Sequence, residues 1–303
     1  MSKKLVFFAS YATDYTGVCG HLPRGGETVI GTEFKMGPGG KGSNQAVAAH
    51  RLGGEVNLIT KIGEDLSGDY ARNFYLKEQI STKYVIVDPK EASGVALIFV
   101  DGGTKENQVL IVPGACTMFT DEDVERVRDA ICNADIFMGQ FEVNLDALEK
   151  AMDIAKSEGL QIVVNPAPAK KVSNEFLAKI DVITPNETEA ELLTGIPVDS
   201  EESAHRVAEV FHKAGIESVI ITMGEKGVFA SKGGQERVIP AHIVKVVDTT
   251  GAGDAFNGAL GFALAEGLDF FDAAEYANRA ASFAVQHFGS GPSMPYKEEM
   301  EGA

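Results

Sequence analysis

Short, uninterrupted runs of apolar residues recur along the chain and predict strands that are buried on both faces. Segments with apolar residues at helical spacing lie between these runs and predict amphipathic helices. Strands that alternate with helices indicate an α/β fold with a mostly parallel sheet covered by helices on both sides. The predicted strands are 5–9, 56–63, 135–140, 160–165, 181–186 and 218–224. The helical stripes are Leu145/Leu148/Met152/Ala155, Val207/Val210/Phe211 and Leu66/Tyr70/Phe74.

Two regions, residues 12–36 and 84–112, interrupt this alternation because they carry strand patterns without a helical one. Consecutive strands without an intervening helix are expected to pair in the antiparallel sense. We therefore predict a small accessory sheet over the end of the main sheet where ligands bind, placed so that it could act as a lid.

Composition narrows the range of functions. The formal net charge of −17 disfavours a nucleic-acid partner, since an acidic surface repels the phosphate backbone. Three widely spaced cysteines give no disulfide framework or zinc cluster and suit a reducing cytoplasm. The sequence shows neither a secretory signal nor an apolar run of about 18 residues, so we expect a cytoplasmic protein without a membrane partner.

The most informative turn is "TTGAGDAF" around Gly251, which a strand over 242–247 is expected to precede and a helix to follow. Glycines at a helix N-terminus expose backbone amides that attract an anion. A dinucleotide-binding fingerprint fails at Phe256, where glycine is required, and a Walker-type loop is absent. Asp254 is then either a helix cap or a base that accepts a hydroxyl proton during phosphoryl transfer.

A second glycine-rich stretch, "GPGGKGSNQAVAAHRLGG" over 37–54, leads into an alanine-rich helix. Lys41 and Asn44 are the only long polar side chains near the start of this helix. The stretch is either a flexible loop with Asn44 as a cap, or a close backbone approach to a polar ligand whose hydroxyls Lys41 and Asn44 bind.

"GGKGSNQAVAAHRLGG" and "DTTGAGDAFNGAL" resemble the two signatures of the PfkB-type carbohydrate kinases. "GETVIG", "SGVALIFVDG", "NPAPA", "ITPNETEAELLTG" and "GSGPSMPY" are similar, in the same order, to the ribokinase branch of that family. The resemblance runs from about Leu5 to Tyr296. It implies a ribokinase-like three-layer sandwich in a single domain, 1–303, with lid segments at about 12–36 and 92–112, and an ATP-dependent kinase that phosphorylates O5 of D-ribose.

The same resemblance implies roles for individual residues. Asp254 corresponds to the base, and the anion hole corresponds to Gly251, Ala252 and Gly253. The sugar-binding positions are Asp14, Gly40, Lys41, Asn44, Glu142 and Asp254. The nucleotide-binding positions are Asn186, Glu189, Thr222, Gly224, Gly227, Gly253 and Asn278, with Glu189 also near Mg²⁺. A monovalent cation, K⁺ in this family, corresponds to Asp248, Thr250, Ala284, His287, Gly289 and Ser293.

One position departs from the family pattern, since Ala12 stands where an asparagine is common. Either a donor to the sugar is lost, or Tyr11 or Thr13 replaces it. This departure keeps open a related substrate, such as 2-deoxyribose, another pentose, a hexose or a nucleoside. A non-catalytic sugar-binding protein and a dehydrogenase are the alternatives from other classes. We also predict a homodimer formed through the lid, because its apolar face needs cover.

Overall fold

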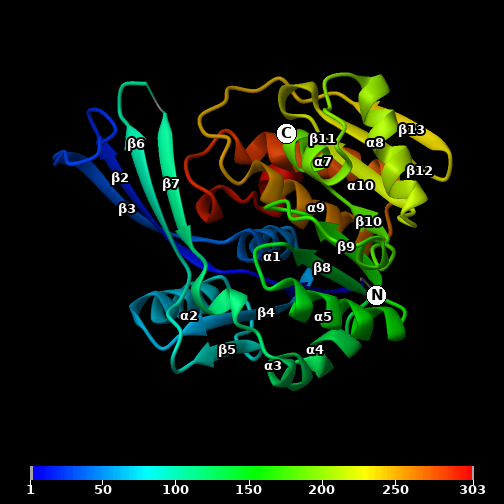
Figure 1. Ribbon diagram of the computed structural model, residues 1–303, viewed down its shortest axis with the longest axis horizontal. Coiled ribbons are helices and arrows are strands. Elements are labelled where there is room, and N and C mark those ends of the chain that lie inside the picture. Colours follow the sequence, from blue (N-terminus) through cyan, green and yellow to red (C-terminus); the bar gives the residue numbers. More distant parts are fainter. Residues whose placement is uncertain (1–2, 105, 302–303) are drawn as a thin grey trace.

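The computed structural model describes residues 3–104 and 106–301, and its strands form one large and one small sheet (Figure 1). Within the described residues, the large sheet has nine strands in the order β13-β12-β11-β10-β9-β8-β1-β4-β5. Its strands pair in parallel, except that β12 runs antiparallel to both β11 and β13. They are β1 Lys4–Phe8, β4 Glu55–Gly63, β5 Val85–Asp88, β8 Ile136–Gln140, β9 Gln161–Asn165, β10 Val182–Ile183, β11 Ser218–Thr222, β12 Val228–Lys232 and β13 Gln235–Ile239.

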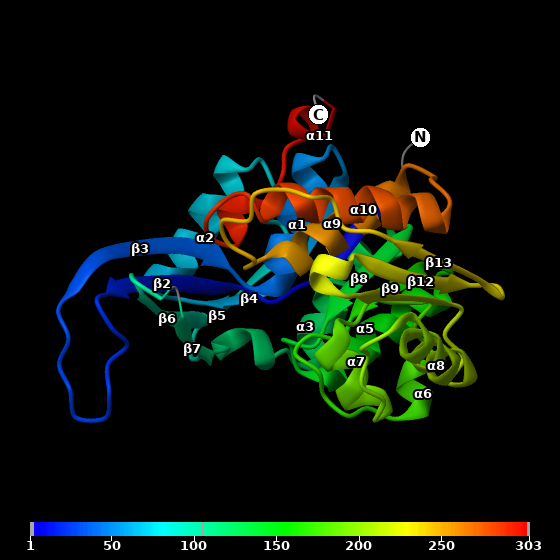
Figure 2. The ribbon, with the colours of Figure 1, turned by 90° about the horizontal axis from the view of Figure 1, so that it is seen from above.

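Helices cover both faces of the large sheet, as Figure 2 shows. Strand β1 explains why, since Leu5 and Phe7 pack into one apolar cluster while Val6 and Phe8 pack into the other. The helices of the first cluster are α1 Lys41–Arg51, α2 Leu66–Lys77, α9 Ala252–Ala265, α10 Phe270–Ala284 and α11 Lys297–Glu301. Those of the second are α3 Asp121–Arg126, α4 Arg128–Cys132, α5 Leu145–Ser157, α6 Asn174–Leu177, α7 Glu187–Thr194 and α8 Glu201–Lys213. None of the helices in the described part of the chain is both long and apolar enough to cross a bilayer.

The small sheet, which we call the lid, projects from one side of the molecule (Figures 1 and 2). Its order is β3-β2-β6-β7. β2 pairs antiparallel with β3, and β6 with β7, as predicted for strands without an intervening helix. β2 and β6 are parallel. The four strands are β2 Ala12–Cys19, β3 Gly31–Gly39, β6 Val95–Asp101 and β7 Asn107–Val112.

Three local predictions were wrong. Residues 84–112 do not all belong to the accessory sheet, because β5 pairs with β4 at the edge of the large sheet. The stripe Leu66/Tyr70/Phe74 is not the buried face of α2, which instead buries Ala71 and Tyr75 one residue further along and leaves Leu66 86% exposed.

Residues 242–247 form no strand either. The β12–β13 hairpin forms that end of the large sheet, and this segment pairs with no strand of the described part of the chain. The backbone N–H groups of Val247 and Asp248 instead donate to the carbonyl of Val285 at the end of α10. Ile243 consequently lies fully exposed.

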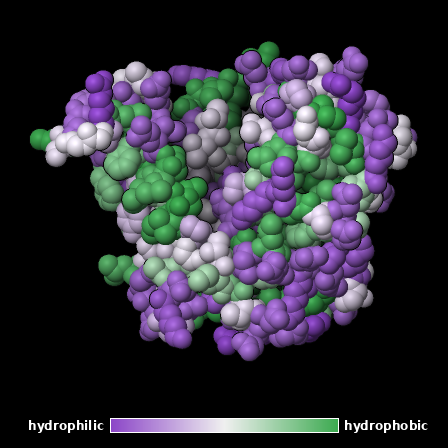
Figure 3. All heavy atoms as spheres, viewed as in Figure 1, coloured by the Kyte–Doolittle hydropathy of each residue, from purple (hydrophilic) through white to green (hydrophobic). Residues whose placement is uncertain are grey.

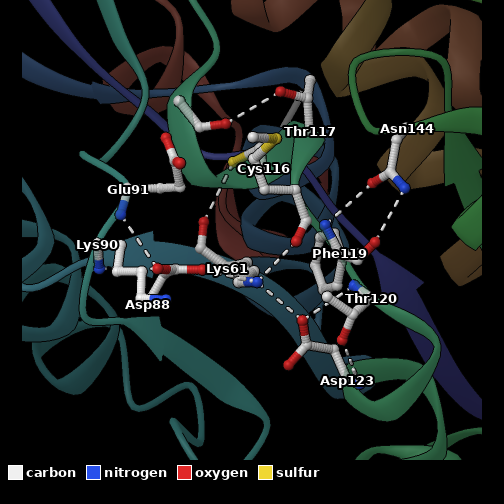
Figure 4. A network of polar contacts seen from close by, with 12 residues as sticks. Lys61, Asp88, Lys90, Glu91, Cys116, Thr117, Phe119, Thr120, Asp123 and Asn144 are labelled. Carbon is white, nitrogen blue, oxygen red and sulfur yellow. Dashed lines mark hydrogen bonds and ion pairs between the residues drawn. The ribbon is translucent and has the colours of Figure 1, made fainter.

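A buried cation ties the body to the segment that follows the lid (Figure 4). The Nζ of Lys61, on β4, lies 2.8 Å from a carboxylate oxygen of Asp88 and 2.8 Å from one of Asp123. It also donates to the carbonyl of Met118 at 2.7 Å. The side chain of Lys61 is only 4% exposed, and burial of an ammonium requires such partners. The network therefore fixes the chain where it leaves β7 and enters α3.

Candidate active site

The glycine turn at 251–253 forms the N-terminus of α9. Gly251 is the residue before the first helical turn and has a φ of +82°, a conformation that favours glycine. A side chain there would approach the Cα of Ser290 to 3.0 Å, whereas a side chain at Gly253 would meet nothing within 4 Å. The backbone at Gly253 thus borders open space at the positive end of the helix dipole, which suits an anion.

Asp254 does not cap the helix, because it is the third residue of α9 and no side chain caps this N-terminus. Its carboxylate is buried and receives two amide hydrogen bonds. Asn44 Nδ2 donates to Oδ2 at 2.9 Å, and Gln45 Nε2 donates to Oδ1 at 3.3 Å. Burial raises the pKa of Asp254, while the charge of Lys41 and the two amide donors act in the opposite direction.

The start of α1 packs closely against the end of β1, and glycines make this approach possible. A side chain at Gly40, whose φ is +89°, would lie 2.7 Å from the Cα of Tyr11. A side chain at Gly42 would lie 2.5 Å from the Cα of Ala9. Asn44 is not a cap, because Gly40 precedes the first turn of α1 and Asn44 lies within the helix. The glycines therefore bring Lys41 and Asn44 to Asp254.

Lys41 is surrounded by carboxylates. Burial alone would lower the pKa of its ammonium, but Asp254, Glu142 and Glu189 together raise it. Glu142, which follows β8, accepts the backbone N–H of Lys41 at 2.9 Å and the hydroxyl of Ser10 at 2.6 Å. Lys41 thus remains charged at the centre of an acidic cluster, where it can donate to hydroxyl or phosphate oxygens.

Asp14, on lid strand β2, is joined to this cluster through the C-terminal part of the chain. Ser290 Oγ donates to Asp14 Oδ2 at 2.9 Å. Burial raises the pKa of Asp14 to about 6; the hydrogen bond from Ser290 opposes this shift, and the charges of Glu142 and Asp254 add to it. Sequence reasoning missed Ser290 and Gln45, and no local pattern identifies either, since their partners are distant in the sequence.

Ala12 supplies no hydrogen-bond donor to a sugar, and the directions of the neighbouring side chains show whether Tyr11 or Thr13 can supply one instead. Tyr11 Oη and Thr13 Oγ1 lie 2.9 Å apart in a buried contact with each other. Side chains alternate along a strand, so Tyr11 and Thr13 point away from the face that carries Ala12 and Asp14. Neither therefore replaces the asparagine, and of the alternatives the loss of a donor is the one that the geometry supports.

Asn186 and Glu189 follow β10, and a third predicted nucleotide residue, Thr222, ends β11. Asn186 and Glu189 form a reciprocal capping box at the start of α7, as the N-x-x-E spacing predicts. Asn186 also forms a bridge with Thr222, the last residue of β11. Burial raises the pKa of Glu189, although the charge of Lys41 opposes this. The cap and the acidic cluster are therefore adjacent.

Two further nucleotide positions, Gly227 and Asn278, contact residues 239–241. Gly224 opens a short 3₁₀ turn, η2 Gly224–Lys226, directly after β11. A side chain at Gly227, whose φ is +94°, would collide with the Ile239 carbonyl and come within 2.6 Å of the backbone nitrogen of Ala241. Asn278 Nδ2 donates to the carbonyl of Pro240 at 2.8 Å. Residues far apart in the sequence thus form one edge of the site.

The predicted cation residues come together in part. The carboxylate of Asp248 accepts the N–H of Thr250 at 2.9 Å and the N–H of Gly289 at 2.9 Å, which ties the glycine turn to the C-terminal loop. In that loop, Ser293 Oγ donates to the carbonyl of Ser290 at 2.7 Å. The imidazole of His287 instead contacts the carbonyl of Phe283 on its own helix end, and the carbonyl of Ala284 accepts the N–H of His287.

The chain is similar to known carbohydrate kinases over nearly its whole length. The family model described as "pfkB family carbohydrate kinase" matches residues 2–297. The chain is 40% identical to a ribokinase of Haemophilus influenzae over 99% of this chain and 97% of that protein. It is 36% identical to a deoxyribokinase of Salmonella typhimurium, with 97% and 96% covered.

A solved structure of Arabidopsis thaliana ribokinase complexed with ribose and ATP superposes with a TM-score of 0.90, at 30% identity and with 100% and 98% of the chains covered. This similarity bears out the predicted fold class, a large mostly parallel sheet with a smaller separate sheet. The family model and the full-length relatives together establish that this chain belongs to the pfkB family of carbohydrate kinases.

Proposed function

We propose that the protein transfers the γ-phosphoryl group of ATP to O5 of D-ribose, giving ribose 5-phosphate and ADP. The observation that carries this proposal is Asp254, an acid buried beside an open glycine turn and held by amides from α1. The ribokinases among its full-length relatives, and the ribose and ATP in a similar structure, support this choice of substrates. Use of ATP also fits the predicted cytoplasmic location.

The chemistry follows from the positions of the side chains. Asp14, Lys41, Asn44 and Glu142 surround the sugar hydroxyls and orient O5 toward Asp254. The Asp254 carboxylate accepts the O5 proton while O5 bonds to the γ-phosphorus and the bond from that phosphorus to the β–γ bridging oxygen breaks. ADP leaves with the bridging oxygen. The backbone amides of Gly251, Ala252 and Gly253 stabilise the charge on the transferring group.

The nucleotide is expected along the edge formed by Asn186, Thr222, Gly224, Gly227 and Asn278. Magnesium suits the same edge, since this ion is usually held by one or two carboxylates together with substrate phosphates. Within residues 3–104 and 106–301, no three His, Cys, Asp or Glu side chains gather to hold a metal by themselves. Glu189, beside Asn186, is the carboxylate we assign to this ion, which would neutralise phosphate charge when bound.

The proposed K⁺ site lies behind the glycine turn. Asp248 holds together the backbone at Thr250 and Gly289, so the two segments that would supply carbonyl ligands are already joined. We assign the backbone carbonyls of three further residues as ligands of this ion: Ala284, His287 and Ser293. An oxygen-rich set of this kind suits a hard monovalent cation. Its contribution when bound would be to order the turn at Gly251.

A second candidate substrate is 2-deoxyribose, and the geometry at Ala12 favours it as the alternative. The site lacks the donor that an asparagine would supply, and Tyr11 and Thr13 do not replace it. 2-Deoxyribose has one hydroxyl fewer than ribose, so fewer of its hydroxyls would lack a hydrogen-bond partner in this site. An unpaired buried polar group costs about 1–3 kcal/mol. The deoxyribokinase relatives are consistent with this alternative. Other pentoses, hexoses and nucleosides remain for the same assay.

We further propose that two copies of the chain pair through their lids. Strand registers put six apolar side chains on the face opposite Asp14: Phe34, Met36, Leu97, Phe99, Leu110 and Val112. All six are more than one third exposed, and Phe34 reaches 69%. Figure 3 shows hydrophobic residues gathered over the β6–β7 part of the lid. A monomer rarely leaves so continuous an apolar face in water, and a second copy of the lid would cover it.

The deciding experiment measures ADP release with ATP and Mg²⁺ over a panel of ribose, 2-deoxyribose, other pentoses, hexoses and nucleosides, in Na⁺ and in K⁺. Asp254→Asn should lower kcat by about 10²–10⁴-fold while sugar binding by calorimetry is retained. Asp272→Asn, an exposed aspartate in the first turn of α10, serves as the matched control. Unchanged turnover of Asp254→Asn would refute its role as the base. Sugar binding without ADP release would identify a binding protein.

A further inference from the structure

A chain of buried polar side chains lies behind Asp254 and is not used by the chemistry described above. It links α1, β8, β9, the end of β10 and α9, so that it crosses the centre of the fold. Each member is at most 8% exposed. The members are Gln140, Gln45, Asn165, Thr184 and Asn257.

The direction of the amides in this chain is fixed by its far end. The carbonyl of Thr184 can only accept, and Asn165 Nδ2 donates to it at 2.9 Å. Asn165 Oδ1 therefore faces Gln45 and accepts from Gln45 Nε2 at 3.3 Å. Gln45 Oε1 in turn accepts from Gln140 Nε2 at 3.1 Å. A flipped Gln45 would turn an oxygen toward both Asn165 Oδ1 and the Asp254 carboxylate.

Gln45 is thus obliged to present its NH₂ group to Asp254 Oδ1, at 3.3 Å. Asn44 donates to the other oxygen, but Asn44 also lies among the proposed sugar contacts. Gln45 has no such second task, because both ends of its amide are occupied within the protein. An amide donor favours the ionised carboxylate and restricts its rotation, and both effects are needed in a buried base.

The chain also reaches the glycine turn. Thr184 Oγ1 donates to Asn257 Oδ1 at 2.6 Å, and Asn257 Nδ2 donates to the carbonyl of Gly253 at 2.8 Å. The same set of hydrogen-bonded side chains therefore supports both the base, through Gln45, and the proposed anion hole, through Asn257.

We propose that Gln45 is a positioning residue that keeps Asp254 ionised and oriented for proton transfer. This proposal rests on the proposed function, since it concerns the base of that reaction. Gln140 contributes indirectly, because its Nε2 donates to Gln45 Oε1 and so holds the amide whose direction Asn165 sets. Gln140 Oε1 has no hydrogen-bond partner among the described residues. The fold thus tolerates one unpaired buried acceptor, while the direction of the hydrogen bonds between the amides is maintained.

The test is the pH dependence of kcat in Gln45→Met, which keeps the length of the side chain and removes the donor. We expect the acidic limb of the kcat profile to move upward by about one pH unit, with kcat at neutral pH at least fivefold lower and sugar KM within about twofold of wild type. Ser43→Ala is the matched control, because it removes another buried polar contact of α1, with Tyr75, that does not involve Asp254.

Gln140→Met is the second variant and guards against misfolding of the first. It leaves the contact between Gln45 and Asp254 but removes the donor to Gln45 Oε1, which holds the amide less firmly, so a smaller shift in the same direction is expected. If Gln45→Met and Gln140→Met both keep the wild-type limb, or if Ser43→Ala shifts it equally, the positioning role is refuted. A wild-type protein inactive on the whole panel would instead refute the proposed function, which separates the two failures.

Discussion

Replacing Ser290 with alanine should make sugar binding more sensitive to acid. Ser290 Oγ donates to Asp14 Oδ2 at 2.9 Å, and Asp14 has a pKa of about 6 because burial outweighs this hydrogen bond. A sugar hydroxyl donates to the ionised carboxylate, so the ionised form is the one that binds. Removal of the serine hydroxyl raises the pKa of Asp14 further, and sugar KM should increase as pH falls through the new value.

The size of the effect follows from the strength of the contact. A hydrogen bond to a charged group contributes about 1.5–3 kcal/mol, and about 1.4 kcal/mol corresponds to one pKa unit, so the pKa should rise to about 7–8. With a pKa of about 7.5, the ionised fraction at pH 7 falls from about 0.9 to about 0.25. Sugar KM at pH 7 should therefore rise about fourfold and return almost to the wild-type value at pH 8.5.

The assay is sugar KM and kcat for wild type and Ser290→Ala between pH 6 and 8.5. Ser282→Ala is the control, since it removes a partly buried serine hydroxyl from α10 that donates to the carbonyl of Arg279 in its own helix. A KM raised equally at every pH would mean that Ser290 shapes the loop without setting the pKa of Asp14. An unchanged KM at pH 6.5 would refute the argument altogether.

Three further predictions test the body, the turn and the lid. Lys61→Met should lower the free energy of unfolding, measured with urea, by about 3–5 kcal/mol because Asp88 and Asp123 lose their cation. Lys83→Met, which breaks an exposed ion pair with Asp129, should leave that free energy nearly unchanged, and equal losses in the two variants would contradict this. Gly253→Ala should leave the melting temperature within about 2 °C but raise the KM for ATP at least tenfold, since its side chain meets only the open space of the anion hole; an unchanged KM would place the phosphate elsewhere. Phe34→Asp should convert a dimer of 32.2 kDa chains to a monomer by light scattering, and a wild type that is already monomeric would refute pairing through the lid.

The elements that sequence reasoning predicted well are those whose signal is local. Strand β1 is apolar at every buried position, so it could be placed without knowing its neighbours. The capping box of Asn186 and Glu189 depends on residues three apart. The wrong strand at 242–247 has the right composition, but whether a sheet edge is free to pair with it is a property of the whole fold.

The supports of the site were not predictable in the same way. Gln45 contacts Asp254 across 209 positions, and Ser290 contacts Asp14 across 276. A glutamine within an alanine-rich helix and a serine in a C-terminal loop have no distinguishing local pattern. Motifs therefore indicate the residues that we propose to contact the substrate, while the residues that orient them appear only when the chain is folded.

Ser290 and Gln45 are expected to act on different steps of the reaction. The pH dependence of sugar binding should therefore be separable from the pH dependence of turnover. Asp14 lies on the lid and is held by Ser290, so in the proposed reaction we expect its ionisation to control how well the sugar binds. Asp254 lies in the body and is held by Asn44 and Gln45, so in the proposed reaction we expect its ionisation to control proton transfer. Asp254 is buried and Asp14 is partly buried, and burial raises both pKa values, yet each carboxylate has its own donors. A change at Ser290 should therefore move KM with pH, and a change at Gln45 should move kcat.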